Sequence, residues 1–196
     1  NYKNAWLKVY DLPVMYFPKF FHPDPTVKRQ SGFLIPKFKS SANSSNYLSV
    51  PYYSVLSLNK DMTFSPRFYK DEKFLLQTEY RQVNLNSNHI SDVSFLKVKE
   101  GNSKSHFFYE FEKKLDFTKF DTSDLNFKFQ KTSNDTYLKA NKLKSPLIIN
   151  EDVLESSIDL DLSTENFSVK SELTVYEDLN KDMNSDKYEY ILPKIN

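Results

Sequence analysis

The feature that most constrains the fold is an alternation of apolar and polar residues with a period of two. Successive side chains of a β-strand point to opposite faces, so this alternation predicts strands with one apolar and one polar face. It is clearest at 73–82, 107–113, 125–130, 158–163 and 167–175. Leu75 is an apolar exception on the polar face of the first of these runs, and Phe108 lies on the same face as Glu110 and Glu112 in the second.

Polar stretches separate the alternating runs and predict the turns between strands. They are Ser40–Asn46, Asn84–Asn88, Asn102–Ser105, Thr132–Asp135 and Asp178–Asp186. Strands of about ten residues between such turns are typical of a membrane β-barrel, although a soluble β-sandwich shows the same alternation. Charged residues occupy the second face of nearly every run, which favours a wide, water-filled lumen. We therefore expect an all-β, antiparallel up-and-down meander that forms part of an outer-membrane β-barrel and does not close by itself. The alternative is a secreted, soluble β-sandwich that acts as a binding module.

Composition supports this prediction and excludes several classes of protein. Aromatic residues make up 16% of the 196 residues, yet the mean hydropathy is −0.63. A barrel with alternating lipid-facing and lumen-facing residues has this combination. The net charge of +1 gives no electrostatic case for nucleic acid. Cysteine is absent, and no apolar run is long enough for a transmembrane helix. The chain opens without an initiator Met or a signal peptide, so we interpret it as a fragment.

The first 26 residues differ from the rest. They contain Pro13, Pro18, Pro23 and Pro25. Proline is confined to edges, starts and bulges of strands, so we expect the last strand of a preceding domain followed by a stiff linker, with a boundary near Val27.

Candidate chemical sites are weak. His22, His89 and His106 share no metal-ligand spacing, and we expect them in the linker, in turns or at strand ends. Asp178–Glu189 matches several ligand positions of a calcium loop but has Met183 where the glycine is required, so a solvated hairpin loop is expected, with weak divalent binding as the alternative. The sequence has no nucleophile, phosphate or dinucleotide motif. We therefore expect no enzymatic activity, no cofactor and no metal.

Several segments resemble the LptD family, also called organic solvent tolerance proteins. The specific ones are LPVMYFPKF, RQSGFLIP (Arg29–Pro36), PYY (Pro51–Tyr53) and NKDMTFSPRFY (Asn59–Tyr69), with EYR, SNDTYL and YEYILPKI as weaker matches further along. The chain departs from the family pattern in having no glycine in the loop before PYY or after NKDMTFSPRFY.

The resemblance implies a role in lipopolysaccharide transport to the outer membrane of a Gram-negative bacterium. Residues 1–26 would be the end of a periplasmic jelly-roll domain with its linker, and residues 27–196 the first strands of the transmembrane barrel. The implied partners are lipopolysaccharide, an LptE-type lipoprotein plug and a periplasmic LptA-type bridge that meets the upstream jelly roll. The lipid would pass through and leave sideways without any chemistry on it.

Two prolines lie in runs that otherwise predict strands, Ser31–Lys39 and Tyr47–Leu58. In a hairpin centred on Asn43–Ser44, paired positions would have residue numbers that add to 87. Pro36 would then share a rung with Pro51, and Leu34 would pair with Tyr53 on the same face. Since proline removes a ladder donor, such a rung is weak. The resemblance implies that these four residues line a lateral gate; the alternative is that the prolines mark an edge or a bulge.

Lys28 and Arg29 precede the first of these strands. We expect them either to contact lipid phosphates near the gate or to form a solvated strand start.

Overall fold

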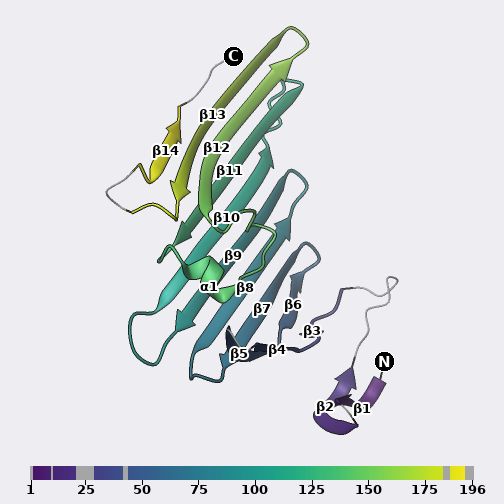
Figure 1. Cartoon of the computed structure of the whole chain (residues 1–196). Coiled ribbons are helices and arrows are strands. Elements are labelled where there is room, and N and C mark those ends of the chain that lie inside the picture. The colour runs from purple at the N-terminus through teal and green to yellow at the C-terminus, as the bar shows by residue number, and fades with distance from the viewer. Residues whose placement is uncertain (1, 10, 21–28, 42–43, 183–185, 193–196) are drawn as a thin grey trace.

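The computed structural model describes residues 2–9, 11–20, 29–41, 44–182 and 186–192. Its main body is a single antiparallel sheet of twelve strands, in which chain neighbours are nearly always sheet neighbours (Figure 1). The predicted all-β, up-and-down meander is confirmed, and the sheet does not close into a barrel. Its strands are β3 (Gly32–Phe33), β4 (Lys37–Ser41), β5 (Ser44–Ser49), β6 (Tyr52–Ser57), β7 (Lys60–Tyr69), β8 (Phe74–Val83), β9 (Ser87–Lys97), β10 (Lys104–Lys114), β11 (Thr122–Thr132), β12 (Val153–Thr164), β13 (Phe167–Asp178) and β14 (Tyr188–Ile191).

The N-terminal segment forms a separate two-stranded sheet of β1 (Tyr2–Val9) and β2 (Leu12–Phe20). The sequence predicted a last strand and then a linker within 1–26; the structure has two strands in 2–20, and Pro13 and Pro18 lie within the second. In a two-stranded ribbon each strand has a free edge, where a missing N–H leaves no partner unsatisfied. The predicted boundary near Val27 lies outside the described residues.

One face of the larger sheet is bare and apolar. Phe95, Phe107, Phe127 and Ile158 are each between 37% and 48% exposed on it. Aromatic side chains meet across neighbouring strands there, as in the pair Phe107 and Phe129, whose ring centroids are 6.0 Å apart. The alternation in the sequence thus predicted which residues share this face.

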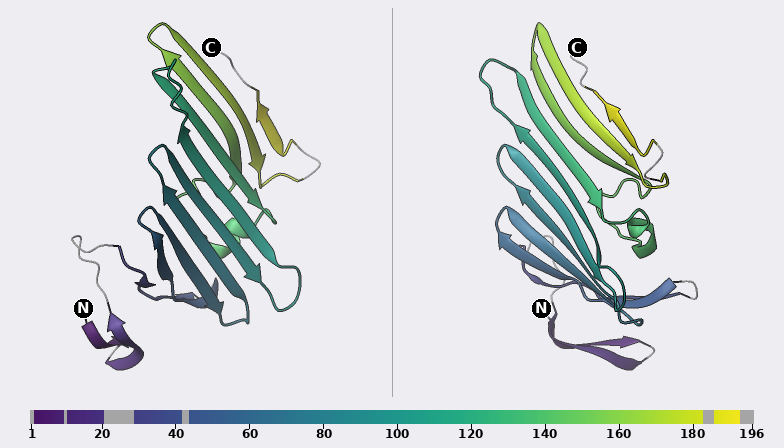
Figure 2. Two further views of the ribbon diagram at one scale, coloured as in Figure 1. Left: turned by 180° about the vertical axis from the view of Figure 1, so that it is seen from behind. Right: turned by 90° about the vertical axis from the view of Figure 1, so that its left-hand side faces the viewer.

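The opposite face is polar and is partly covered by the connection between β11 and β12. This connection, residues 133–152, will be called the covering loop, and it contains the short helix α1 (Tyr137–Asn141). Both panels of Figure 2 place α1 against the sheet on one side only. Within the described residues, no helix has the length and apolar character to cross a membrane.

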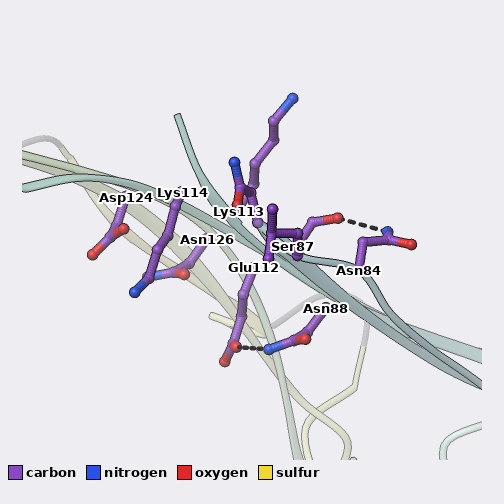
Figure 3. A pocket seen from close by; sticks show the side chains of 10 residues that line it. Asn84, Ser87, Asn88, Glu112, Lys113, Lys114, Asp124 and Asn126 are labelled. Carbon is purple, nitrogen blue, oxygen red and sulfur yellow. Dashed lines mark hydrogen bonds between the residues drawn. The ribbon is translucent and has the colours of Figure 1, made fainter. Parts of the chain in front are cut away.

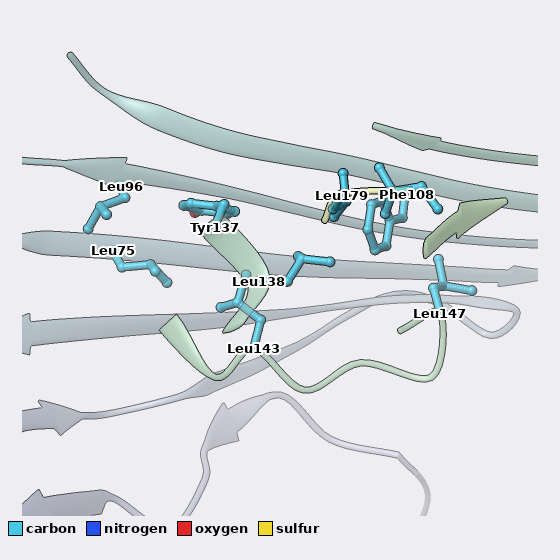
Figure 4. Close-up of a cluster of buried hydrophobic side chains, with 9 residues drawn as sticks. Leu75, Leu96, Phe108, Tyr137, Leu138, Leu143, Leu147 and Leu179 are labelled. Carbon is cyan, nitrogen blue, oxygen red and sulfur yellow. The ribbon is translucent and has the colours of Figure 1, made fainter. Parts of the chain in front are cut away.

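The hydrophobic core lies between the covering loop and the sheet (Figure 4). Leu75 and Phe108, the two apolar residues on otherwise polar faces, are 0% and 1% exposed there. They pack in one cluster with residues of the covering loop and its neighbours, namely Tyr137, Leu138, Leu143, Leu147, Leu96, Leu154 and Leu179. The covering loop therefore packs on the two residues that break the alternation.

The two ends of the sheet differ. One end has the connections 58–59, 84–86, 115–121 and 165–166, all far shorter than the connection between β11 and β12, and will be called the turn end. The other, the loop end, has the connections 70–73 and 98–103, the covering loop, and the connection between β13 and β14. The covering loop thus reaches back from the loop end over the polar face.

Replacing Leu138 by Ala should loosen the covering loop. Leu138 is fully buried, and removal of a buried leucine side chain typically costs about 2–5 kcal/mol. We expect limited proteolysis of the full-length protein to cleave within 133–152 much faster in this variant. Ile149→Ala is the matched control, because Ile149 lies in the same loop and is 78% exposed. Equal cleavage of the two variants would contradict the assignment of Leu138 to the core.

Candidate functional site

The first hairpin of the larger sheet is interrupted in the middle of both its strands. On the outgoing strand, β3 ends at Phe33 and β4 begins at Lys37, with Pro36 in the gap. On the returning strand, β5 ends at Ser49 and β6 begins at Tyr52, with Pro51 in the gap. Both prolines that the sequence singled out therefore lie where the strands are broken.

The predicted register of this hairpin is wrong. On the turn-end side the paired residue numbers add to 85, as in Gly32 with Tyr53, and towards the loop end they add to 86. Leu34 therefore faces Pro51, and its N–H donates to the Pro51 carbonyl at 2.8 Å. Pro36 and Pro51 do not share a rung, and Leu34 does not pair with Tyr53. Leu34 still lies on the same face as Tyr53, because it is two residues beyond Gly32.

The change of register has a simple cause, a β-bulge. Between the pair Leu34–Pro51 and the pair Lys37–Ser49, two residues on the outgoing strand oppose only Val50 on the return. The tip also lies one residue earlier than predicted, since Ser41 pairs with Ser44. A run of seven polar residues does not reveal where a turn is centred, and a bulge has no signal of its own in the sequence.

A further proline, which the sequence reasoning missed, lies at the same level on β7. Both β5 and β6 pair with β7 in one register, with residue numbers that add to 116. The unpaired stretch 50–51 therefore faces 65–66, and Pro66 stands opposite Val50. The signal was present in NKDMTFSPRFY, where Pro66 interrupts an otherwise clear strand pattern.

The backbone nitrogen of Pro66, which carries no hydrogen, points at the gap between β5 and β6. The N–H of Lys70, just beyond β7, donates to the carbonyl of Asn46 on the β5 side at 3.1 Å. Because N–H groups alternate in direction along a strand, the nitrogen of Pro66 points to the same side, where Val50 would otherwise receive its hydrogen bond.

The other two prolines lack donors on different sides. The nitrogen of Pro51 faces Leu34, which donates to Pro51 but receives nothing in return. Beyond the bulge, Lys37 faces Ser49, so the nitrogen of Pro36 points away from the hairpin, to the edge of the sheet formed by the described residues. At this one level, backbone N–H donors are therefore missing between the two strands of the hairpin, between the hairpin and β7, and at the edge of the sheet.

This level separates the hairpin into two parts. The part made of β4 and β5 will be called the outer hairpin. In the right panel of Figure 2 it projects from the sheet towards the side on which α1 lies. The proline level is thus the place where the hairpin leaves the plane of the sheet.

Arg29 lies beside the turn-end half of this hairpin. Its Nε donates to the Tyr53 hydroxyl at 2.9 Å, and its guanidinium pairs with Asp61. Asp61 also pairs with Arg81 at 2.8 Å and is 5% exposed. Arg29 therefore fastens the start of the sheet to the polar face of β7 and β8. Lys28 lies outside the described residues, and contact of either residue with lipid phosphate stays a prediction.

A buried polar cluster anchors the covering loop. The Ser94 Oγ lies 2.6 Å from His106 Nδ1 and 2.6 Å from the Tyr137 hydroxyl, and His106 Nε2 lies 3.5 Å from Asp92. These side chains resemble a catalytic Ser–His–Asp group only by type, because they are sealed under the loop. Burial raises the pKa of Tyr137 to about 12, although its hydrogen bond with Ser94 opposes the shift. The cluster therefore holds the loop in place.

A small pocket of ≈ 200 Å³ lies at the turn end (Figure 3). It is open to solvent and lined by amides and charges, with Asn88 donating to Glu112 at 3.3 Å. His22 and Met183 lie outside the described residues, and among the described ones no group of three or more potential ligands could hold a metal ion.

Replacing Pro66 by Ala should strengthen the seam between β7 and the returning strand. The new N–H would point at the Val50 carbonyl, and a hydrogen bond of this kind contributes about 1 kcal/mol. Hydrogen exchange of the peptide 60–69 in the full-length protein should then show an additional protected amide. Pro146→Ala is the control, because it adds an amide in the exposed part of the covering loop. Fast exchange of the amide that Pro66→Ala introduces would show that the donor faces elsewhere.

The chain is similar to several curated proteins. It is 37% identical over 97 residues to the LPS-assembly protein LptD of Pseudomonas aeruginosa strain UCBPP-PA14, which covers 50% of this chain and 10% of that protein. It is 29% identical over 178 residues to the protein of the same name from Francisella tularensis subsp. holarctica strain OSU18, covering 88% of this chain and 19% of the relative. A third, from Pseudoalteromonas atlantica, is 29% identical over 138 residues, 69% of this chain and 18% of the relative.

The chain thus matches between about a tenth and a fifth of the length of these relatives. No family model matches it. The matches come from different bacteria, carry one name and together extend over most of the chain, in agreement with the segments that resembled this family in the sequence. The chain is therefore similar to LptD proteins over most of its length.

Proposed function

We propose that this chain is part of an outer-membrane protein that assembles lipopolysaccharide at the cell surface. Its larger sheet would be the beginning of the barrel wall, and its first hairpin would border the lateral exit for the lipid. The observation that carries the second proposal is the level of Pro36, Pro51 and Pro66, where backbone donors are missing beside the edge of the sheet.

The two faces of the sheet support a place in the membrane wall. The bare face carries Phe95, Phe107, Phe127 and Ile158, and its apolar surface suits contact with acyl chains. The opposite face carries charged groups such as Asp61 and Arg81, which require water or partners. A soluble β-sandwich would need a second sheet against the bare face, and the described residues provide none.

The connections support an orientation. Outer-membrane barrels have short turns on the periplasmic side and longer loops outside. The turn end would therefore face the periplasm, and the covering loop would start from the outer side and reach into the lumen. Residues 1–26 would belong to the periplasmic jelly roll and its linker, where an LptA-type bridge would deliver the lipid. An LptE-type lipoprotein would occupy the lumen.

A lateral exit has to open between hydrogen-bonded strands. Lipopolysaccharide carries polar sugars and phosphates, which suit the lumen, and acyl chains, which suit the bilayer. A lateral path would let the acyl chains enter the bilayer while the sugars and phosphates stay in the lumen. Each interstrand hydrogen bond contributes about 1 kcal/mol net, and an unsatisfied backbone group in lipid costs several. An edge that already lacks N–H donors has fewer hydrogen bonds to break, so opening it costs less free energy. The protein would guide the lipid and perform no chemistry on it.

Photocrosslinking in cells tests the position of the exit. A photoreactive residue at Leu34 or at Tyr53 of the full-length protein should form adducts with lipopolysaccharide, because both lie on the lumenal side of the broken hairpin. The same probe at Ile149, an exposed site in the covering loop, is the control for nonspecific capture. Adducts elsewhere in the barrel, with none at Leu34 or Tyr53, would keep the transport function and reject this exit. Adducts at no position would favour a binding module instead.

The double substitution Pro36→Ala and Pro51→Ala tests the prolines themselves. It restores two backbone donors, one towards Leu34 and one towards the edge, so opening the edge should become harder by about 1 kcal/mol per bond. We expect slower appearance of new lipopolysaccharide at the cell surface, roughly several-fold, at equal levels of assembled protein. Pro146→Ala serves as the matched control. An unchanged rate would show that the prolines mark only an edge or a bulge.

A further inference from the structure

Arg67 follows Pro66 on β7 and touches two elements that do not belong to the same hairpin. Its Nη1 donates to the carbonyl of Asn141, in the covering loop, at 2.6 Å. Its guanidinium carbon lies 5.0 Å from the centre of the Tyr47 ring, in the outer hairpin. The side chain is only 8% exposed, so both contacts are made in a confined space.

These two contacts suit the chemistry of arginine. The planar guanidinium donates hydrogen bonds from its rim and stacks its face on an aromatic ring. The ring of Tyr47 is itself held in place, because its centroid lies 5.3 Å from that of Tyr69. Among the described residues, no carboxylate lies within ion-pair distance of Arg67. The charge of this buried group is therefore met by neutral partners: the Asn141 carbonyl, the Tyr47 ring and the Tyr69 hydroxyl.

Other side chains of the sheet also hold carbonyls of the covering loop. The amide of Gln77 donates to Lys144 at 3.1 Å, and that of Gln130 donates to Leu147 at 2.8 Å. Both belong to strands that do not border the outer hairpin. Arg67 differs because the same guanidinium also contacts Tyr47 next to the proline level.

We propose that Arg67 is a positioning residue that couples the covering loop to the outer hairpin. With the loop docked, the Asn141 carbonyl holds the guanidinium over Tyr47, and the hairpin stays folded towards the lumen. When the loop lifts, the guanidinium loses the Asn141 carbonyl and is no longer held over the ring of Tyr47. Only the backbone pairs between β5 and β7 then still hold the outer hairpin, so it turns more readily at the level of Pro36, Pro51 and Pro66. This inference rests on the lateral exit proposed above and adds what controls it.

The coupling has to act in both directions, because it is one free energy shared by two elements. A hairpin held away from the sheet should loosen the loop to the same degree as a displaced loop frees the hairpin. A substance in the lumen that displaces the loop would therefore open the edge without touching the prolines.

The test is a distance measurement between spin labels in the full-length protein in lipid nanodiscs. One label replaces Phe38 on the outer hairpin and the other replaces Phe95 on β9, both exposed sites. Arg67→Ala should raise the population with a displaced hairpin about thirtyfold or more, the loss expected for one charged hydrogen bond and one cation–π contact. Arg67→Lys keeps the charge but not the planar group, and should show an intermediate effect. Gln130→Ala is the matched control, because it removes a loop contact on a strand that does not border the outer hairpin.

A double-mutant cycle with Leu138→Ala separates coupling from local packing. Leu138→Ala, which displaces the loop, should free the hairpin when Arg67 is present and add nothing when Arg67 is already replaced by alanine. An unchanged hairpin in Arg67→Ala, or equal effects of Leu138→Ala in both backgrounds, would overturn the proposal. Heat-modifiable migration of each variant shows whether the barrel has assembled. If Arg67→Ala does not assemble, Arg67→Lys replaces it in the cycle.

This measurement is independent of lipopolysaccharide, so the two proposals fail separately. A non-additive cycle without adducts at Leu34 or Tyr53 supports the coupling and rejects the exit. An additive cycle with adducts at those positions rejects the coupling and keeps the exit.

Discussion

Backbone hydrogen bonding between strands is the constraint on which the rest of this structure depends. From β7 to β13 the ladder passes from strand to strand without a shift in register. In the first hairpin it is interrupted at one level, where Pro36, Pro51 and Pro66 each lack a donor on a different side. The continuous part makes a stiff wall, and the interrupted part lets the outer hairpin leave its plane.

The covering loop adds a second kind of constraint. A polar face that carries Leu75 and Phe108 would expose them to water unless something packed there. The loop places Tyr137 and Leu138 on them and fastens itself through Ser94 and the other buried polar groups. Apolar burial thus holds the loop down, and hydrogen bonds from the sheet decide where each part of it lies.

These two constraints meet at Arg67. It lies on the polar face of β7, one residue beyond the last proline of the break, under the end of α1 and beside the outer hairpin. A short distance along one strand therefore connects the place where the ladder fails with the place where the loop is held. This arrangement would give the proposed exit a physical means of responding to movement of the covering loop.

The sequence by itself determined the all-β fold, the faces of the clearest strands and about half of the turns, because a period of two needs only the order of residues along one strand. It also identified Pro36 and Pro51 as a weak point. Only the tertiary structure decided the register of the first hairpin, because the bulge at Ile35–Pro36 has no pattern of its own, and register in turn placed Pro66 at the same level. Leu75 was visible in the sequence as an exception, but its partner Leu138 lies far along the chain. Contacts such as those of Arg67 depend on how a loop folds back over several strands, and no local pattern encodes them.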